Sequence, residues 1–308
     1  MQKLEVESQL RKLMALISIL KRWSRPKIAF GALFVCGLLL GIWSIGIEPG
    51  LLAVNQTSLA LPEWPEAFDH LKIVAIADLH VGSPHITLGK LQRVVKTINE
   101  MKPDVVVLLG DYVIHGVVGG SFTEPESIAD QLKGLRANLA VAAVLGNHDW
   151  WYDGPRVTRA LQQAGIRVLE NEAIEIQRHG QSFWLAGVGD YWTWHHNLEK
   201  TFAQVTNDAP VIALTHSPDL FPKIPAQVIL TLAGHTHGGQ VNLPLIGRPI
   251  VPSAFGQRYA IGHIEENQHH LFVTSGIGTS ILPVRLRVLP EILVLTIVAR
   301  PQTMGERR

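Results

Sequence analysis

Acidic, amide and imidazole side chains gather at five places in the 308-residue sequence, separated by stretches of mostly apolar residues. The five motifs are Asp78-Leu79-His80, Gly110-Asp111, Gly146-Asn147-His148-Asp149, His216 and Gly234-His235-Thr236-His237. Carboxylate oxygens, amide oxygens and imidazole nitrogens suit borderline divalent metals such as Mn, Fe, Zn or Co. The single cysteine, Cys36, lies outside the motifs. The motifs therefore predict a metal site without thiolate ligands.

Each motif directly follows a short apolar run that is typical of a buried β-strand. The five runs are Leu71–Ala77, Val105–Leu109, Leu139–Leu145, Val211–Leu214 and Val228–Leu232. In α/β sheets the ligand crevice lies at the carboxyl ends of the strands. Alternate residues of an extended chain point the same way, so Asp78 with His80, and His235 with His237, can each supply two ligands.

The segments between these strands predict how the domain is layered. Helical patterns are expected at Leu88–Ile98, Pro125–Leu135 and Pro155–Ala164, and a further strand at Ile166–Leu169. The second half is richer in strands, which are expected at Ala173–Gln177, Ser182–Val188, Tyr259–Ile264, His270–Thr274 and Glu291–Val298. Strands that first alternate with helices and then meander fit a layered α/β domain of roughly 230 residues.

The N-terminal part predicts a membrane anchor. Residues 28–47 contain no charged side chain, and twenty helical residues span roughly 30 Å, the thickness of a bilayer core. Basic residues precede this segment and acidic ones follow it, which places the N-terminus in the cytoplasm and the C-terminal part outside. A cleaved signal peptide, cut near Ser58-Leu59-Ala60, is the competing interpretation, but the apolar run exceeds the usual 7–15 residues.

These features predict five regions. Residues 1–27 are a basic cytosolic tail, 28–47 a transmembrane helix, 48–69 a proline-containing tether, 70–300 the enzymatic domain and 301–308 a tail. The N-terminal 27 residues hold seven basic and two acidic side chains, a net charge of +5. Because the whole chain has a net charge of +1, the remaining residues carry −4. An acidic domain argues against a nucleic-acid partner, because such proteins usually carry a basic excess. A single cysteine also excludes a disulfide scaffold.

The order and spacing of the five motifs resemble the complete motif set of calcineurin-like metallophosphoesterases. Within that superfamily the chain is most similar to the membrane-anchored bacterial YkuE/YaeI-type branch. The resemblance to the branch rests on the anchor, on Gly234–Gln240 (GHTHGGQ) and on Gly278-Thr279-Ser280 followed by Pro283 and Arg285. It implies a four-layer α/β/β/α metallophosphoesterase sandwich behind an N-terminal transmembrane helix.

The resemblance also implies a dinuclear centre of two divalent ions, such as Mn, Fe or Zn. Asp78, His80 and His237 would bind one ion, and Asn147, His216 and His235 the other. Asp111 would bridge the two ions. Two ions roughly 3.5–4 Å apart can clamp a phosphoryl group and hold a bridging hydroxide as the nucleophile.

The same resemblance assigns catalytic roles to two residues beside the ligands. His148 would face the scissile phosphate, stabilise developing charge and protonate the leaving oxygen. Asp149 would hydrogen-bond His148 and keep its ring oriented. Taken singly, each motif residue has an ordinary structural explanation, such as a helix cap for Asp78 or a turn for Asp111, but five coincidences would be needed.

Two aromatic clusters suggest how substrate is held. Trp151 belongs to a run that follows the third motif, and Trp192 to a run that precedes His216. They are expected either to line the site for an amphiphilic substrate, or to touch the bilayer, or simply to pack on the domain. Arg285 is a further candidate for the substrate, through a phosphate oxygen.

The expected function is a membrane-anchored phosphoesterase that hydrolyses phosphodiester or monoester bonds of envelope or lipid-linked substrates, with its catalytic domain periplasmic or extracellular. One alternative is a pyrophosphatase of lipid A synthesis that cleaves UDP-2,3-diacylglucosamine, although such substrates form inside the cell. Another is a non-catalytic membrane scaffold that keeps the fold. A nuclease is disfavoured by the acidic domain.

Overall fold

The computed structural model describes residues 11, 14 and 25–300, which form part of two compact units, Met1–Ile47 and Glu48–Arg308. The C-terminal tail predicted at 301–308 and most of the basic tail predicted at 1–27 lie outside the described residues.

The first unit contains one long apolar helix. Helix α2 (Arg25–Gly41) continues into a π-helical turn at Ile42–Ile47. Residues Ala29–Gly50 are long enough and apolar enough to cross a membrane, with a mean hydropathy of 2.2. Twenty-two helical residues extend about 33 Å. The segment matches the span predicted at 28–47.

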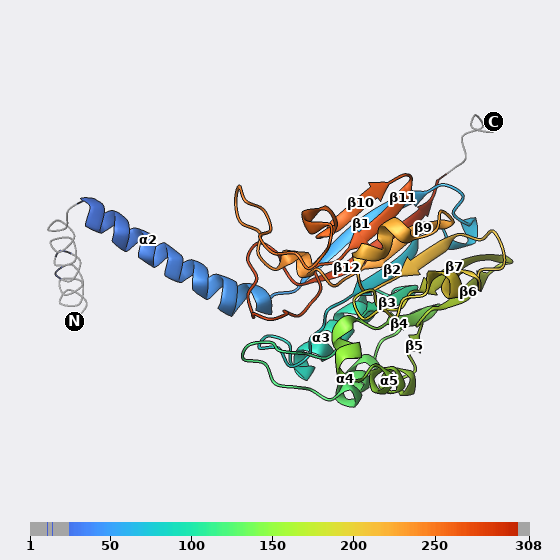
Figure 1. The fold of residues 1–308 in the computed structure, drawn as a ribbon, viewed down its shortest axis with the longest axis horizontal. Helices are drawn as coiled ribbons and strands as arrows, with labels where there is room; N and C mark the ends of the chain where they lie inside the picture. Colours follow the sequence, from blue (N-terminus) through green and yellow to red (C-terminus); the bar gives the residue numbers. More distant parts are fainter. Residues whose placement is uncertain (1–10, 12–13, 15–24, 301–308) are drawn as a thin grey trace, which may run out of the picture. The chain divides into compact units, whose positions relative to one another are not determined.

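The second unit is built on two six-stranded mixed sheets (Figure 1). The order of the first is β1-β12-β2-β3-β4-β5 and that of the second is β10-β11-β9-β8-β7-β6. The strands are β1 (Ala53–Leu61), β2 (Leu71–Ile76), β3 (Val105–Leu109), β4 (Ala140–Val144), β5 (Arg167–Val168), β6 (Glu172–Arg178), β7 (Gln181–Gly187), β8 (Val211–Leu214), β9 (Val228–Ala233), β10 (Gly262–Glu266), β11 (His269–Val273) and β12 (Glu291–Ala299).

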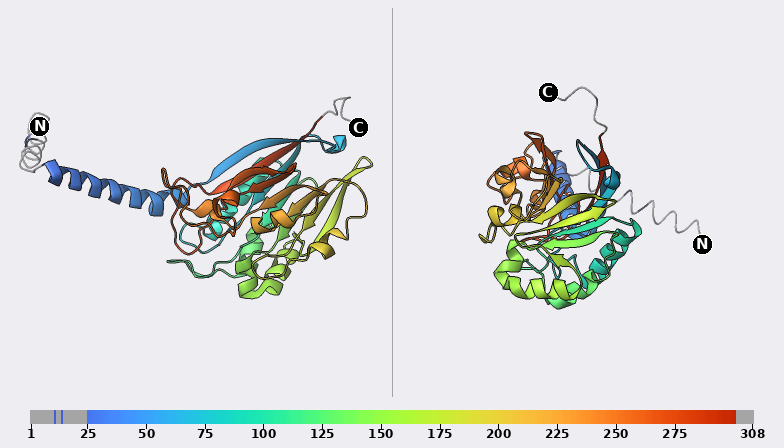
Figure 2. Two further views of the ribbon diagram at one scale, coloured as in Figure 1. Left: turned by 45° about the horizontal axis from the view of Figure 1, so that its top comes forward. Right: turned by 90° about the vertical axis from the view of Figure 1, so that its right-hand side faces the viewer.

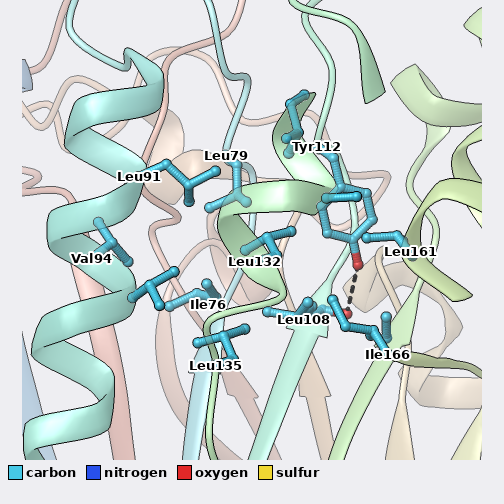
Figure 3. Packing of buried hydrophobic residues seen from close by; sticks show 14 of the residues in the cluster. Ile76, Leu79, Leu91, Val94, Leu108, Tyr112, Leu132, Leu135, Leu161 and Ile166 are labelled. Atoms are coloured by element: carbon cyan, nitrogen blue, oxygen red, sulfur yellow. Dashed lines mark hydrogen bonds between the residues drawn. The ribbon is translucent and has the colours of Figure 1, made fainter. Parts of the chain in front are cut away.

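Helices cover the outer face of the first sheet. They are α3 (Leu88–Glu100), α4 (Pro125–Leu132) and α5 (Asn147–Gln163), and they lie together on one side of the sheets (Figure 2). The buried stripe Leu91, Val94 and Ile98 of α3 packs on side chains of β2 and β3. Figure 3 shows this layer, in which the Tyr112 hydroxyl donates to the Leu108 carbonyl at 3.2 Å.

A second apolar layer lies between the two sheets. Ile73 and Val107 of the first sheet belong to the same buried cluster as Ile212, Leu232 and Phe272 of the second. Strand β3 is therefore covered on both faces, which explains why its sequence, VVVLL, is continuously apolar rather than alternating.

The outer layer on the second sheet is thin. It consists of α6 (Leu198–Phe202) and a 3₁₀ helix at Pro218–Lys223, which pack on β7 and β8. The order of layers is thus helix, sheet, sheet, helix, and the expected four-layer sandwich is confirmed.

The structure differs from the sequence prediction in three places. The strand expected at Tyr259–Ile264 begins only at Gly262, as β10, because Gly256–Tyr259 form a 3₁₀ helix. The segment 48–69, expected to be a tether, contains β1, which pairs in parallel with β12 along nine residues. The three prolines misled the prediction because they flank this strand without interrupting it. Helix α5 begins at Asn147 rather than at Pro155, because two helical stretches join at Asp153, where φ is −166° and ψ is 82°.

Candidate metal centre

The five motifs meet at one edge of the sandwich. Strands β2, β3 and β4 run in parallel in the first sheet, as do β8 and β9 in the second, so the carboxyl ends of each set share an edge. Tight turns follow these strands. Gly110 has φ 91°, and a Cβ there would lie 2.5 Å from the Gly146 amide nitrogen, so only glycine fits between the second and third motifs.

One cluster joins Asp78, His80 and His237, all buried. The Nε2 atoms of His80 and His237 are 3.1 Å apart, and His237 Nε2 lies 3.5 Å from Asp78 Oδ1. Asp78 also accepts the His235 backbone N–H, at 3.1 and 3.0 Å for its two oxygens. The first and fifth motifs are thereby fixed against each other.

A second cluster joins Asp111, His216 and His235. His216 Nε2 lies 3.2 Å from Asp111 Oδ2, 3.2 Å from Asn147 Oδ1 and 3.1 Å from His235 Nδ1. These four residues come from the second, third, fourth and fifth motifs.

Asp111 lies between the clusters. Its Oδ2 atom is 3.2 Å from His216 Nε2 and 3.6 Å from His80 Nε2, which belong to different clusters. Its other oxygen accepts the His148 backbone N–H at 2.9 Å. One carboxylate oxygen facing both sets is the arrangement that a bridging ligand requires.

The donor atoms fit divalent metal ions. His80 Nδ1 faces the Val113 carbonyl at 3.2 Å and His216 Nδ1 faces the Leu109 carbonyl at 2.7 Å, so each ring donates from Nδ1 and directs its Nε2 atom inward. Around His216 Nε2 the neighbouring oxygens of Asp111 and Asn147 are also acceptors. Convergent lone pairs repel one another unless a cation lies among them.

Five of the seven predicted ligands have left-handed backbones. The φ angles are 52° at Asp78, 41° at His80, 58° at Asp111, 70° at His235 and 51° at His237. Such conformations cost energy for residues other than glycine and gather at functional sites, where the surrounding structure maintains them. The turns after the strands therefore hold these side chains in position, although the backbone conformation is locally unfavourable.

Burial and mutual charge set the pKa values of the cluster. Burial lowers the pKa of His80 and of His235 to about 3, which leaves neutral rings, the form that binds metals. Burial acts in the same direction on His216, but the Asp111 carboxylate outweighs it and raises the pKa of His216 to about 10.

His148 lies beside the clusters at the start of α5. Its Nε2 atom is 3.9 Å from Asp111 Oδ2, and its ring makes an edge contact with His80, with centroids 4.7 Å apart. Its Nδ1 atom is buried and has no hydrogen-bond partner among the residues that the structure describes. Burial lowers the pKa of His148. The His148 ring therefore lies next to the donor residues, and its Nδ1 atom can hydrogen-bond another molecule.

Asp149 does not orient His148, which corrects the expectation from the resemblance. Its carboxylate accepts four backbone N–H groups, from Asp111 and Gly146 on Oδ2 and from Tyr112 and Val113 on Oδ1, at 2.8–3.3 Å. It therefore ties the turn after β3 to the turn after β4, and it supports Asp111 rather than His148.

Arg285 does not reach a substrate, which corrects a second expectation. Its side chain is fully buried, and its guanidinium donates to the carbonyls of Ser275, Gly276, Gly278 and Val288 at 2.6–3.2 Å. It fixes the loop that packs on Asp78, where the Gly278 N–H donates to the Asp78 carbonyl at 2.6 Å.

The two predicted tryptophans flank the donor set on different sides. Trp151 lies 5.0 Å from the His148 ring, and Trp192 lies 5.3 Å from the His235 ring, between centroids. Both side chains remain exposed. Both rings therefore lie next to the site, and their contact with a substrate stays a prediction.

Sequence reasoning missed two acids near the centre, the half-buried Glu170 and the buried Asp190. Glu170 accepts the Leu145 N–H at 2.7 Å, and burial raises the pKa of Glu170 to about 8. Asp190 is fully buried and accepts the Thr193 N–H at 2.7 Å, and burial raises its pKa too. Both follow strands of the same edge, β5 and β7, a position that could have identified them.

Comparison with known proteins agrees with this geometry. The family model for calcineurin-like phosphoesterases matches residues 71–241, which include every motif residue. The chain is 31% identical to the metallophosphoesterase YkuE of Bacillus subtilis, over 90% of this chain and 99% of the relative. It is 33% identical to the phosphodiesterase YaeI of Escherichia coli, over 82% and 90%.

A more distant relative has a named substrate. The UDP-2,3-diacylglucosamine pyrophosphatase LpxG of Chlamydia trachomatis is 25% identical, over 67% of this chain and 75% of that protein. The family depends on a dinuclear metal centre, and the His/Asp clusters of this chain suit one. The chain belongs to the calcineurin-like phosphoesterase family and is a metal-dependent hydrolase of phosphoester bonds.

Proposed function

We propose that the chain is a membrane-anchored phosphoesterase whose seven donor residues hold two divalent ions. Asp78, His80 and His237 would hold one ion and Asn147, His216 and His235 the other, with Asp111 shared. The observation that carries this assignment is the position of Asp111, with one carboxylate oxygen 3.2 Å from His216 and 3.6 Å from His80.

Two bound ions would polarise the phosphoryl oxygens and lower the pKa of a water nucleophile. The chain's own residues supply the remaining chemistry. The phosphate would lie next to His148, which is beside the donor set and whose buried Nδ1 has no partner among the described residues. A negative phosphate favours the protonated ring, and His148 would then give that proton to the leaving oxygen.

Residues 28–47 are proposed as the membrane anchor, with the N-terminus in the cytoplasm and residues 48–300 as the catalytic domain on the outer side of the membrane. The length and apolar character of this helix support anchoring. The seven basic residues within 1–27 support the orientation.

The proposed substrates are phosphate esters of the envelope or of lipids. Exposed Trp151 and Trp192 flank the donor set and would hold the apolar part of an amphiphile. UDP-2,3-diacylglucosamine is the second candidate, because a relative is named for its hydrolysis. A non-catalytic scaffold has no support from the site, since every ligand of the family motif is present.

A substrate panel tests this proposal. The full chain, purified in detergent with Mn²⁺, would be assayed on phospholipids, lipid-linked pyrophosphates, UDP-2,3-diacylglucosamine, an aryl phosphodiester and soluble nucleotides. We expect a lipid-bearing phosphate ester to give the highest kcat/KM, and Trp151→Ala or Trp192→Ala to raise KM for it while leaving aryl ester hydrolysis nearly unchanged. A soluble nucleotide as the best substrate would overturn the lipid assignment.

A further inference from the structure

Six large aliphatic side chains project from the loops around the candidate metal centre. They are Val118, Leu245, Ile246, Ile250, Ile281 and Leu282, and each is more than half exposed. We call them the aliphatic rim. Isolated exposed apolar residues are ordinary on protein surfaces, whereas a contiguous group marks an interaction site.

The loops that carry the rim are tied together. The Val118 N–H donates to the Ile281 carbonyl at 2.9 Å. Gln240 donates from its side chain to the carbonyls of Ser280 and Leu282, at 3.1 and 3.3 Å. The three loops, at residues 112–123, 234–261 and 274–290, therefore form one surface, and Figure 1 shows them at the same end of the domain.

Two rim residues adopt backbones that disfavour their side chains. Leu245 has φ 68° and the β-branched Ile281 has φ 62°, where asparagine or glycine would cost less. Both side chains are exposed, so packing within the domain does not explain them.

Charge also separates this surface from the rest of the chain. The three loops contain no aspartate or glutamate, although the sequence contains 26 acidic residues. Their charged residues are all arginines, namely Arg248, Arg258, Arg285 and Arg287. Arg285 is buried and Arg258 pairs with Glu266, which leaves Arg248 and the exposed Arg287 as the basic side chains of this surface. Loops that carry exposed aliphatic and basic side chains, and no acidic ones of their own, suit the surface of a bilayer with anionic lipids.

The chain enters the domain beside these loops. The Val288 N–H donates to the Glu48 carboxylate at 2.8 Å, and the Ala53 N–H donates to the Pro290 carbonyl at 2.8 Å. Glu48 and Ala53 belong to the same compact unit as these loops, and the apolar helix ends directly before them in the sequence. The chain would therefore leave the proposed membrane anchor within a few residues of its contact with the loop at 274–290.

We propose that the aliphatic rim docks in the bilayer surface and opens the metal centre toward lipid. The inference builds on the membrane anchoring proposed above. The loops begin beside the site, since 112–123 follows Asp111, 234–261 contains His235 and His237, and Gly278 donates to Asp78. A substrate would therefore enter from the membrane, headgroup first.

Depth measurements with spin labels test the proposal on the full chain in vesicles of phosphatidylcholine with phosphatidylglycerol. The native Cys36 reports on the anchor. In a Cys36→Ser background, labels at Leu245→Cys and Ile281→Cys report on the rim, and a label at exposed Asp208→Cys, before β8 and hence at the opposite edge, is the control. We expect oxygen to relax the two rim labels more strongly than aqueous nickel does, and the reverse at Asp208.

The outcomes separate docking from anchoring. A lipid-exposed label at Cys36 with water-exposed rim labels would overturn docking and leave the anchor standing. Rim labels in lipid with a water-exposed Cys36 would support docking and overturn the anchor. Water exposure at all these positions would overturn both.

A functional variant gives a second readout. Leu245→Asn with Ile281→Asn removes two rim side chains and suits their positive φ angles. We expect hydrolysis of a phospholipid substrate in vesicles to fall at least about tenfold, while hydrolysis of a soluble aryl phosphate stays unchanged. An equal rate on vesicle substrate, or an equal loss on both substrates, would contradict docking.

Discussion

The His148 side chain shows how a single residue can be part of the site without belonging to the donor set. It contacts His80 by an edge-to-face arrangement and keeps a buried nitrogen without a partner. Among the donors, His80 and His216 are oriented through Nδ1, which faces a backbone carbonyl in each case. The proposed roles therefore differ: the donors would bind metal, and His148 would move a proton.

Replacing His148 by alanine tests that separation. We expect kcat to fall about 10²–10⁴-fold, the usual contribution of a general acid, with metal content unchanged. Elemental analysis and steady-state kinetics on an aryl phosphate measure the two quantities. His179→Asn, at an exposed hairpin turn, is the matched control and should keep full activity. Unchanged kcat in His148→Ala would exclude the acid role.

Glu170 gives a pH-dependent prediction. Burial raises its pKa from 4.5 to about 8 in the folded chain, so at neutral pH the folded state holds a proton that the unfolded state has released. Stability contributed by this group is present below pH 4.5 and is lost as pH rises toward 8.

Glu170→Gln removes that dependence. The free energy of unfolding of the wild type should therefore fall relative to the variant between about pH 5 and 8, by at most about 1.4 kcal/mol per pH unit. Denaturant titrations in detergent at several pH values measure it, with Glu172→Gln, an exposed neighbour, as the control. Parallel stability curves for wild type and Glu170→Gln would contradict the burial account.

At the scale of elements, the site is an edge where the turns after parallel strands converge. The strands and their polar ends could be predicted because apolar runs and motif residues alternate in the sequence. The role of Asp149 could not, because it depends on the distance between the turns after β3 and β4, which no local pattern encodes. The burial of Arg285 likewise depends on carbonyls brought together by a folded loop.

Asp149→Asn tests the link between the two turns. The asparagine side chain would place its NH₂ group against backbone N–H donors, where a carboxylate oxygen now accepts. We therefore expect a loss of about 3 kcal/mol in the free energy of unfolding. We also expect weaker metal binding, because the turn that carries Asp111 would shift. Thermal unfolding and metal titration in detergent check both effects. Asp130→Asn, exposed on α4, should change neither. Full stability together with lost activity would instead favour a direct catalytic role for Asp149.

On the scale of the whole molecule, a candidate membrane helix and a phosphoesterase domain occur in one chain. The apolar span and the domain after it were evident from charge and hydropathy. The strand at Ala53–Leu61 was not, because it forms by pairing with β12, whose residues lie more than 200 positions later. Likewise, the aliphatic rim could not be predicted, since its loops are distant in sequence.

The number of metal ions bound by the purified full chain tests the central claim most directly. After removal of metal and titration with Mn²⁺, we predict two ions per chain in the wild type, with hydrolysis appearing as the sites fill. Asp111→Asn should weaken binding of both ions and abolish activity, because that carboxylate faces both clusters. Hydrolysis that persists without metal, or two tightly bound ions in Asp111→Asn with full activity, would contradict the account.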